Sequence, residues 1–221
     1  MKIDITQINQ WGTIFAQIGN TFKNLVNRGI PKFIDFFVEG EYKYLVTEKL
    51  FGQNLAQYIH QQGTVSSQQG IQWMIEVCEL LDYLHNQQSS IIHGDIQPLN
   101  LFIRKLDNRI VLQNFRFIKQ IGMPVSTFLY SGIYVAPEQK YGQLLIQSDI
   151  YAIGVTLFFI LTGEKPKTFY HQGDRSNQFH LEGTYNLTTK LQTIILQATQ
   201  PNPENRYSTA KELAQALFTC L

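Results

Sequence analysis

Apolar residues follow two kinds of spacing along the chain. Between residues 5 and 26 they recur every three or four positions, which predicts an amphipathic helix. Two runs rich in aromatic and β-branched residues, 30–38 and 42–47, are separated by Glu39-Gly40-Glu41 and predict a β-hairpin. The N-terminal part is therefore expected to contain one helix followed by two strands.

Longer helical patterns follow the hairpin. Residues 55–60 predict a short helix, and Ser66-Ser67-Gln68-Gln69 has the sequence of a capping box at the start of a longer one. Residues 150–161 form the longest apolar run, and we expect them to be helical. Helical spacing returns at residues 187–199 and 208–217. The sequence thus predicts an α+β fold whose larger, C-terminal part is mainly helical.

Composition and charge limit the class of protein. The chain has 221 residues, enough for one sizeable core or two small lobes, and its net charge of +1 favours neither nucleic acid nor a membrane surface as a partner. Cys78 and Cys220 are far apart and indicate neither a disulfide framework nor a metal site. The apolar run 150–161 is too short to cross a bilayer, and we find no signal-like segment, so a cytoplasmic protein is expected.

The candidate chemistry is concentrated in residues 92–116. A polar loop contains Asp95 and, five residues later, Asn100; a short hairpin then turns at Asp107-Asn108 and leads to Asn114-Phe115-Arg116. This stretch resembles the catalytic centre of the protein kinases. That family has His-Arg-Asp-Leu-Lys-Pro-x-Asn in the loop and Asp-Phe-Gly after the hairpin.

Three later motifs extend the resemblance. They are similar to the segment that closes the kinase activation loop, to the opening of the central kinase helix, and to a late Pro-x-x-Arg element. In order, they read Tyr134-Val135-Ala136-Pro137-Glu138-Gln139, Ser148-Asp149-Ile150-Tyr151-Ala152-Ile153-Gly154 and Pro203-Glu204-Asn205-Arg206-Tyr207. Because four motifs follow in the family's order at its spacings, we expect a protein kinase-like fold.

The resemblance implies roles for individual residues. Asp95 occupies the position of the base that accepts the substrate hydroxyl's proton, and Asn100 and Asn114 occupy the positions that hold magnesium. The segment after the first hairpin resembles the hinge where adenine docks, with Thr47 as gatekeeper followed by Glu48 and Leu50.

Five further residues have implied structural roles. His93 and Phe115 would stack in the core, and Glu138 and Arg206 would form a buried ion pair. Asp149 would accept hydrogen bonds from the backbone of the catalytic loop, although simple capping of the helix at 150–161 would select the same residue.

Several positions depart from the family pattern, and each departure removes a charge or a conformational freedom. Asn114 is neutral where the family has a magnesium-binding Asp, and Gln97 is neutral where it has a Lys. Gly94 replaces an Arg that in many kinases binds the activation-loop phosphate. Arg116 stands where the family has a Gly. The residues that handle phosphate are lost, while those that hold the fold together remain.

The N-terminal part resembles a reduced kinase N-lobe. We expect it to span residues 1–52, including the hinge, with the C-lobe at 53–221. The three strands that carry the family's Gly-rich loop and phosphate-binding Lys have no counterpart before the first helix. That helix also lacks the Glu that pairs with the Lys: the expected position is near Ile18, and no acid occurs between Asp4 and Asp35. The joint loss indicates a coherent truncation.

Three functions are consistent with this pattern. The first is a pseudokinase with little or no phosphotransfer, which acts as an interaction, scaffold or regulatory module with a protein partner. The second is a divergent Ser/Thr protein kinase that uses ATP and magnesium, with Asp95 as base. The third is a half-kinase completed by a second copy or by a strand-donating partner, which would use the exposed edge of the strand at 30–38. Under the first reading ATP and magnesium need not bind.

Overall fold

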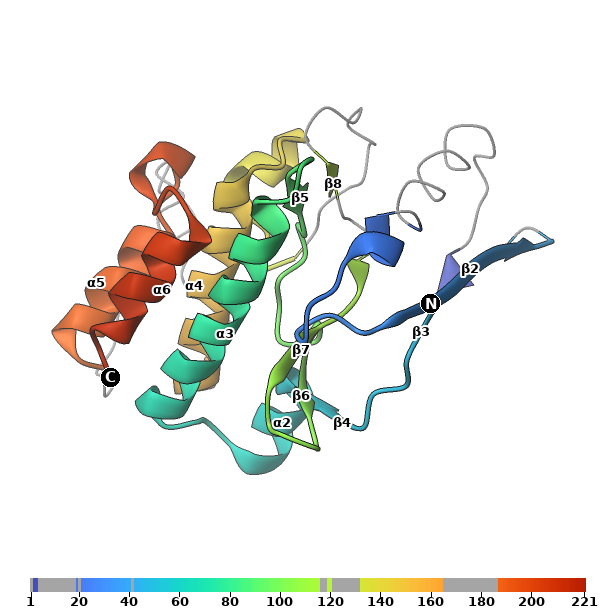
Figure 1. Cartoon of the computed structure of the whole chain (residues 1–221). Coiled ribbons are helices and arrows are strands. Elements are labelled where there is room, and N and C mark those ends of the chain that lie inside the picture. The colour runs from blue at the N-terminus through green and yellow to red at the C-terminus, as the bar shows by residue number, and fades with distance from the viewer. Residues whose placement is uncertain are drawn as a thin grey trace.

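The computed structural model describes residues 2–3, 19, 21–40, 42–115, 119–120, 132–164 and 187–221. Among these residues, a group of packed helices occupies one side of the molecule and most of the small antiparallel sheets the other (Figure 1). The α+β class and the kinase-like arrangement of few N-terminal strands before a helical part are confirmed.

The N-terminal sheet has the strand order β1-β3-β2. Strands β2 (Phe33–Glu39) and β3 (Tyr42–Thr47) form the predicted hairpin around Gly40, whose φ of +59° suits glycine. β2 starts three residues later than expected. A third strand, β1 (Lys2–Ile3), pairs with the other edge of β3, with Lys2 opposite Tyr44. The two-stranded expectation missed it because two residues show no periodicity.

The predicted helix at residues 5–26 lies largely outside the described residues. Its described end is helical at residues 21–24. There Phe22 is 1% exposed, and its ring meets that of Phe115 edge to face at 4.5 Å between centroids. This contact joins the N-terminal helix to the segment after the catalytic loop.

A second sheet positions that loop. It consists of β4 (Gly52–Asn54), β6 (Leu101–Arg104) and β7 (Ile110–Leu112) in the order β4-β6-β7. The β6–β7 hairpin turns where the sequence predicted it, with Asn108 at φ +56°. Its open end brings the two candidate segments together, since the Gln113 amide donates to the Asn100 carbonyl at 2.8 Å. A separate two-stranded sheet pairs β5 (Ile91–Ile92) with β8 (Lys119–Gln120), and β5 contacts α3 (Figure 1).

Helices make up most of the remaining fold. They are α2 (Leu55–Gln62), α3 (Ser67–His85), α4 (Ile146–Thr162), α5 (Thr189–Ala198) and α6 (Ala210–Phe218), with short 3-10 helices η2 (Pro137–Tyr141) and η4 (Pro203–Asn205). α4 is buried continuously from residue 148 to 158 and contacts α3, α5 and α6 (Figure 1). No helix in the described ranges is both long and apolar enough to cross a membrane.

Helix starts show where local sequence decides the structure. The Ser66 hydroxyl accepts the Gln69 amide at 3.2 Å and caps α3 as predicted. α4, however, begins at Ile146, four residues earlier than expected. Asp149 therefore lies inside the first turn of α4, and the alternative in which it caps the helix is wrong.

Candidate active site

The loop that carries Asp95 is fastened to α4 by a buried carboxylate. Asp149 is fully buried, and its Oδ1 accepts the backbone N–H of Gly94 at 2.7 Å. Its Oδ2 accepts the backbone N–H of His93 at 3.0 Å and a ring N–H from Nε2 of His85, also at 3.0 Å. Three donors on two elements thus fix the loop, the role that the resemblance implied for Asp149.

His93 holds the loop from the other side. Its Nδ1 accepts the Asp95 backbone N–H at 3.2 Å, and its Nε2 donates to the Gln113 carbonyl at 3.1 Å. This pattern requires a neutral ring with its hydrogen on Nε2. Burial lowers the pKa of His93 below its ordinary value, against the opposing effect of Asp149 and Asp95. The ring also meets Phe115 edge to face at 5.0 Å, as expected for a packing role.

Asp95 lies at the centre of a network of neutral amides. Its Oδ1 accepts from Gln97 Nε2 at 2.5 Å and its Oδ2 from Asn114 Nδ2 at 3.0 Å. Its backbone carbonyl accepts from Asn100 Nδ2 at 2.7 Å. The structure therefore brings Asp95, Asn100 and Asn114 together, as the motif spacing predicted, and adds Gln97 to the same site.

Asn114 has an unusual backbone conformation. Its φ is +63°, in the left-handed region that non-glycine residues adopt at a cost and that Asn tolerates better than most. The turn directs its side chain back to Asp95 and leaves the next residue, Phe115, 3% exposed between Phe22 and His93. One conformational choice at Asn114 thus places both an amide in the site and a ring in the core.

A small cavity lies next to this network. Its volume is about 210 Å³, and its walls are both apolar and polar. They comprise Phe22, Pro31, Leu45, Thr47, Gln113, Asn114 and Phe115. The predicted gatekeeper Thr47 and the predicted metal position Asn114 therefore line one space, smaller than the roughly 300–1,000 Å³ of ordinary ligand pockets.

The other predicted nucleotide residues lie elsewhere. Glu48 is exposed, and its contacts are with Lys32: its backbone N–H donates to the Lys32 carbonyl at 2.9 Å, and its Oε1 accepts the Lys32 N–H at 2.9 Å. Leu50 is half-buried. The residues that line the cavity do not include Glu48, Leu50 or Asn100.

The residues present do not fit a magnesium site of the family type. A hard cation prefers charged oxygen ligands, whereas Asn100 and Asn114 supply only neutral amide oxygens. Among the described residues, no group of three or more His, Cys, Asp or Glu side chains is placed to hold a metal ion. Asp95 is the single carboxylate in this amide network.

Gly94 stands at a crowded point of the loop. Its φ is +74°, and a Cβ at this position would lie 3.0 Å from Leu144. Its carbonyl accepts from Nε2 of the buried Gln139 at 2.9 Å, while Oε1 of Gln139 accepts the Ala136 N–H at 2.9 Å. Gln139 thus ties the Ala-Pro-Glu segment to the catalytic loop.

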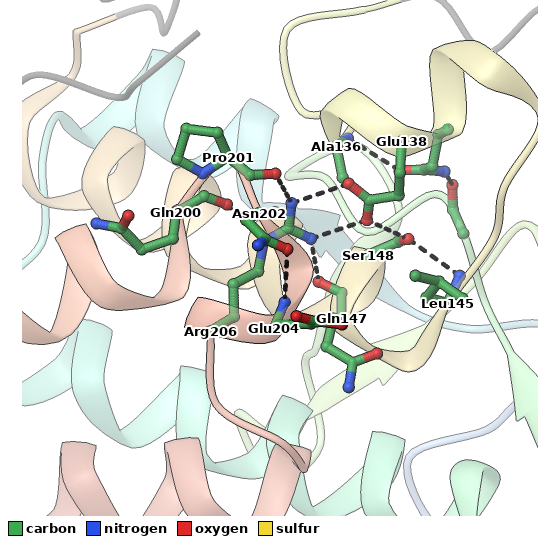
Figure 2. A network of polar contacts seen from close by, with 12 residues as sticks. Ala136, Glu138, Leu145, Gln147, Ser148, Gln200, Pro201, Asn202, Glu204 and Arg206 are labelled. Atoms are coloured by element: carbon green, nitrogen blue, oxygen red, sulfur yellow. Dashed lines mark hydrogen bonds and ion pairs between the residues drawn. The ribbon is translucent and has the colours of Figure 1, made fainter. Parts of the chain in front are cut away.

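A buried ion pair between Glu138 and Arg206 joins the Ala-Pro-Glu segment to the turn between α5 and α6 (Figure 2). Nη1 and Nη2 of Arg206 donate to Oε1 and Oε2 of Glu138, both at 2.8 Å, and Ser148 adds a hydroxyl hydrogen bond to Oε1 at 2.6 Å. Burial alone would raise the pKa of Glu138, but the hydrogen bonds from Arg206 and Ser148 outweigh it and lower the pKa below its ordinary value.

The remaining donors of Arg206 are also used. Nε donates to the Gln200 carbonyl at 2.7 Å, Nη1 to that of Gln147 at 2.8 Å and Nη2 to that of Pro201 at 3.0 Å (Figure 2). All five guanidinium hydrogens therefore have acceptors. The guanidinium carbon also lies 4.9 Å from the centre of the Tyr151 ring.

Three residues of these networks were missed by sequence reasoning. They are His85, Gln139 and Ser148, which bind Asp149, Gly94 and Glu138 respectively. Gln139 and Ser148 stand in quoted motifs and His85 ends α3, but a neutral polar residue in such a place has no distinctive pattern.

Comparison with known proteins agrees with the geometry. The family model described as "Protein kinase domain" matches residues 9–219. Serine/threonine-protein kinase B of Synechocystis sp. is 30% identical over 200 residues, covering 85% of this chain and 34% of that protein. Serine/threonine-protein kinase C of the same organism is 32% identical over 197 residues, covering 85% and 36%.

A mycobacterial relative gives the same picture. Serine/threonine-protein kinase PknB of Mycobacterium leprae is 30% identical over 192 residues, covering 81% of this chain and 30% of that protein. The chain spans about a third of the length of these curated relatives. Because the family model covers nearly the whole sequence and the motifs meet in one site, this chain belongs to the protein kinase family.

Proposed function

We propose that this chain is a pseudokinase, a kinase-fold protein with little or no phosphotransfer that acts as an interaction or regulatory module. One observation carries the proposal: both carboxylate oxygens of Asp95 accept hydrogen bonds from neutral amides, Gln97 and Asn114, at positions where the family has a Lys and an Asp. The loss of charge and the geometry of the substituted side chains point the same way.

Phosphotransfer depends on the charges placed around the phosphoryl group. Kinases act mainly by placing positive charge, from metal ions and Lys, where negative charge spreads in the transition state. At this site Gln97 and Asn114 contribute no charge, and their N–H groups are directed at Asp95. A base that is held by two donors is also less able to accept a proton from a substrate hydroxyl. Both effects reduce phosphotransfer.

A phosphotransfer assay tests this proposal. The purified chain would be incubated with γ-labelled ATP, magnesium or manganese, and a generic basic protein, next to an Asp95→Asn variant. We expect the same background label from both. Label that depends on metal and disappears with Asp95→Asn would establish the alternative, a divergent Ser/Thr kinase that uses Asp95 as base.

A second candidate is favoured by the N-terminal sheet. Among the described residues, β2 pairs only with β3, and it exposes Ile34 (60%), Phe37 (42%) and Val38 (61%). Exposed apolar edge strands tend to pair with other chains. A second copy, or a partner that donates a strand, would complete the sheet in a half-kinase assembly.

Solution mass separates the two candidates. A self-contained interaction module is expected to elute as a monomer in chromatography with light scattering. A half-kinase paired through β2 would elute as a dimer that Val38→Lys returns to monomer, with Leu106→Lys, an 88% exposed position on the β6–β7 turn, as the control.

A further inference from the structure

Asp95 is bonded through its backbone as well as its carboxylate. Besides the amides of Gln97 and Asn114 on its two oxygens, its N–H donates to His93 Nδ1 and its carbonyl accepts from Asn100. The contact with Asn114 is the longest of these in sequence, across 19 positions, and crosses from the catalytic loop to the segment after β7. The others remain within the loop.

That crossing contact directly precedes Phe115 in the chain, next to the hydrogen bonds of Gln113 with His93 and Asn100. Asn114 has a φ of +63°, which is a minority conformation for a residue with a side chain. A strained turn persists only where its surroundings hold it. The hydrogen bond from Asn114 Nδ2 to Asp95 Oδ2 at 3.0 Å is such a restraint, and Phe115 follows directly, packed on His93 and Phe22.

We infer that Asp95 is a positioning residue, which through Asn114 holds the segment after β7 in the turn that places Phe115 in the core. This role explains why a carboxylate remains where charged phosphate-handling residues are lost. This positioning role requires a hydrogen-bond acceptor at one of positions 95 and 114 and a donor at the other. It does not depend on whether the chain transfers phosphate.

An exchange of the two side chains is the direct test. In the 221-residue chain, Asn114→Asp would place two carboxylates about 3 Å apart in a half-buried site, and we expect the melting temperature at pH 7 to fall by about 5 °C. The double variant Asp95→Asn/Asn114→Asp restores one acceptor facing one donor, and we expect it to melt within about 2 °C of the original chain.

Two further variants show whether a loss of stability is specific to a carboxylate placed against Asp95. Leu99→Asp adds a carboxylate to the same loop at a 58% exposed position and should change the melting temperature by about 1 °C or less. Gln97→Glu places a carboxylate against the other oxygen of Asp95, so it should lower the melting temperature more than Leu99→Asp even if Asn114→Asp does not fold.

Hydrogen exchange of backbone amides reports whether the segment after β7 keeps its position. The amides of Gln113, Asn114 and Phe115 should exchange faster in Asp95→Asn and in Asn114→Asp, and the exchanged pair should restore their protection. Failure of the double variant to recover stability and protection would overturn the inference, as would Asn114→Asp and Gln97→Glu both behaving like Leu99→Asp. Neither readout uses nucleotide, so the result is separate from that of the phosphotransfer assay.

Discussion

Arg206 binds both carboxylate oxygens of Glu138 at 2.8 Å, although the two residues are 68 positions apart. Their side chains are 0% and 5% exposed. The pair fixes η2, at the end of the Ala-Pro-Glu motif, to the turn between α5 and α6 (Figures 1 and 2). Because Gln139 in η2 also binds Gly94, η2 connects the turn between α5 and α6 to the catalytic loop.

Removing one partner of this pair should be costly. Arg206→Ala leaves the Glu138 carboxylate buried without its cation, and we expect a loss of about 3 to 5 kcal/mol in the free energy of unfolding, measured by urea denaturation. The matched control is Arg104→Ala, which breaks a pair with Asp107 at 2.6 Å whose side chains are 22% and 34% exposed, and which should cost less than about 1 kcal/mol. Equal losses for the two variants would show that the Glu138 pair does not stabilise the fold.

The same pair predicts a pH dependence. The pKa of Glu138 is lowered in the folded chain from an ordinary value of 4.5, so the unfolded chain binds more protons as the medium becomes acidic. Stability from the ionised carboxylate is full above pH 4.5 and is lost as the pH falls through the lower folded value. The stability gap between the original chain and Glu138→Gln should therefore be widest near neutrality and narrow below pH 4.5. A constant gap from pH 7 to pH 3 would contradict the assignment.

Gly94 should not tolerate a side chain. Gly94→Ala would hold a Cβ at φ +74° and 3.0 Å from Leu144, so we expect a loss of about 1 to 3 kcal/mol from backbone strain and crowding. Gly40→Ala is the control, because its φ is +59° and a Cβ there meets nothing within 4 Å. Thermal melting should show a smaller loss for Gly40→Ala; the reverse order would mean that Leu144 yields freely.

Local motifs predicted the site better than they predicted the N-terminal sheet. The hairpin around Asp107-Asn108 is a short-range feature that returns the chain to the catalytic loop and so brings Asn114 to Asp95, while Asn100 binds Asp95 within the loop itself. β1, by contrast, consists of two residues that pair with β3 across 40 to 42 positions, and no local pattern encodes such a pairing. The predicted two-stranded hairpin was therefore right about β2 and β3 and incomplete about the sheet.

Helix boundaries and the contacts of neutral residues depend on tertiary structure. α4 starts at Ile146 because Ser148 accepts the Leu145 N–H at 3.1 Å, and the same hydroxyl donates to Glu138. The sequence pattern placed the start at residue 150, where the apolar run begins. The losses of charge at Gln97 and Asn114 were readable from the sequence, but their common partner, Asp95, was visible only in the structure.

The central claim is that Asp95, Asn100 and Asn114 do not form a metal-dependent nucleotide site. Thermal melting with ATP, with and without magnesium or manganese, tests it most directly. A ligand at about 100 times its dissociation constant adds roughly 2.7 kcal/mol, a rise of about 5 to 10 °C for a domain of this size. We predict no metal-dependent rise in the melting temperature. A rise of that size that requires the metal would contradict the claim and support a divergent kinase.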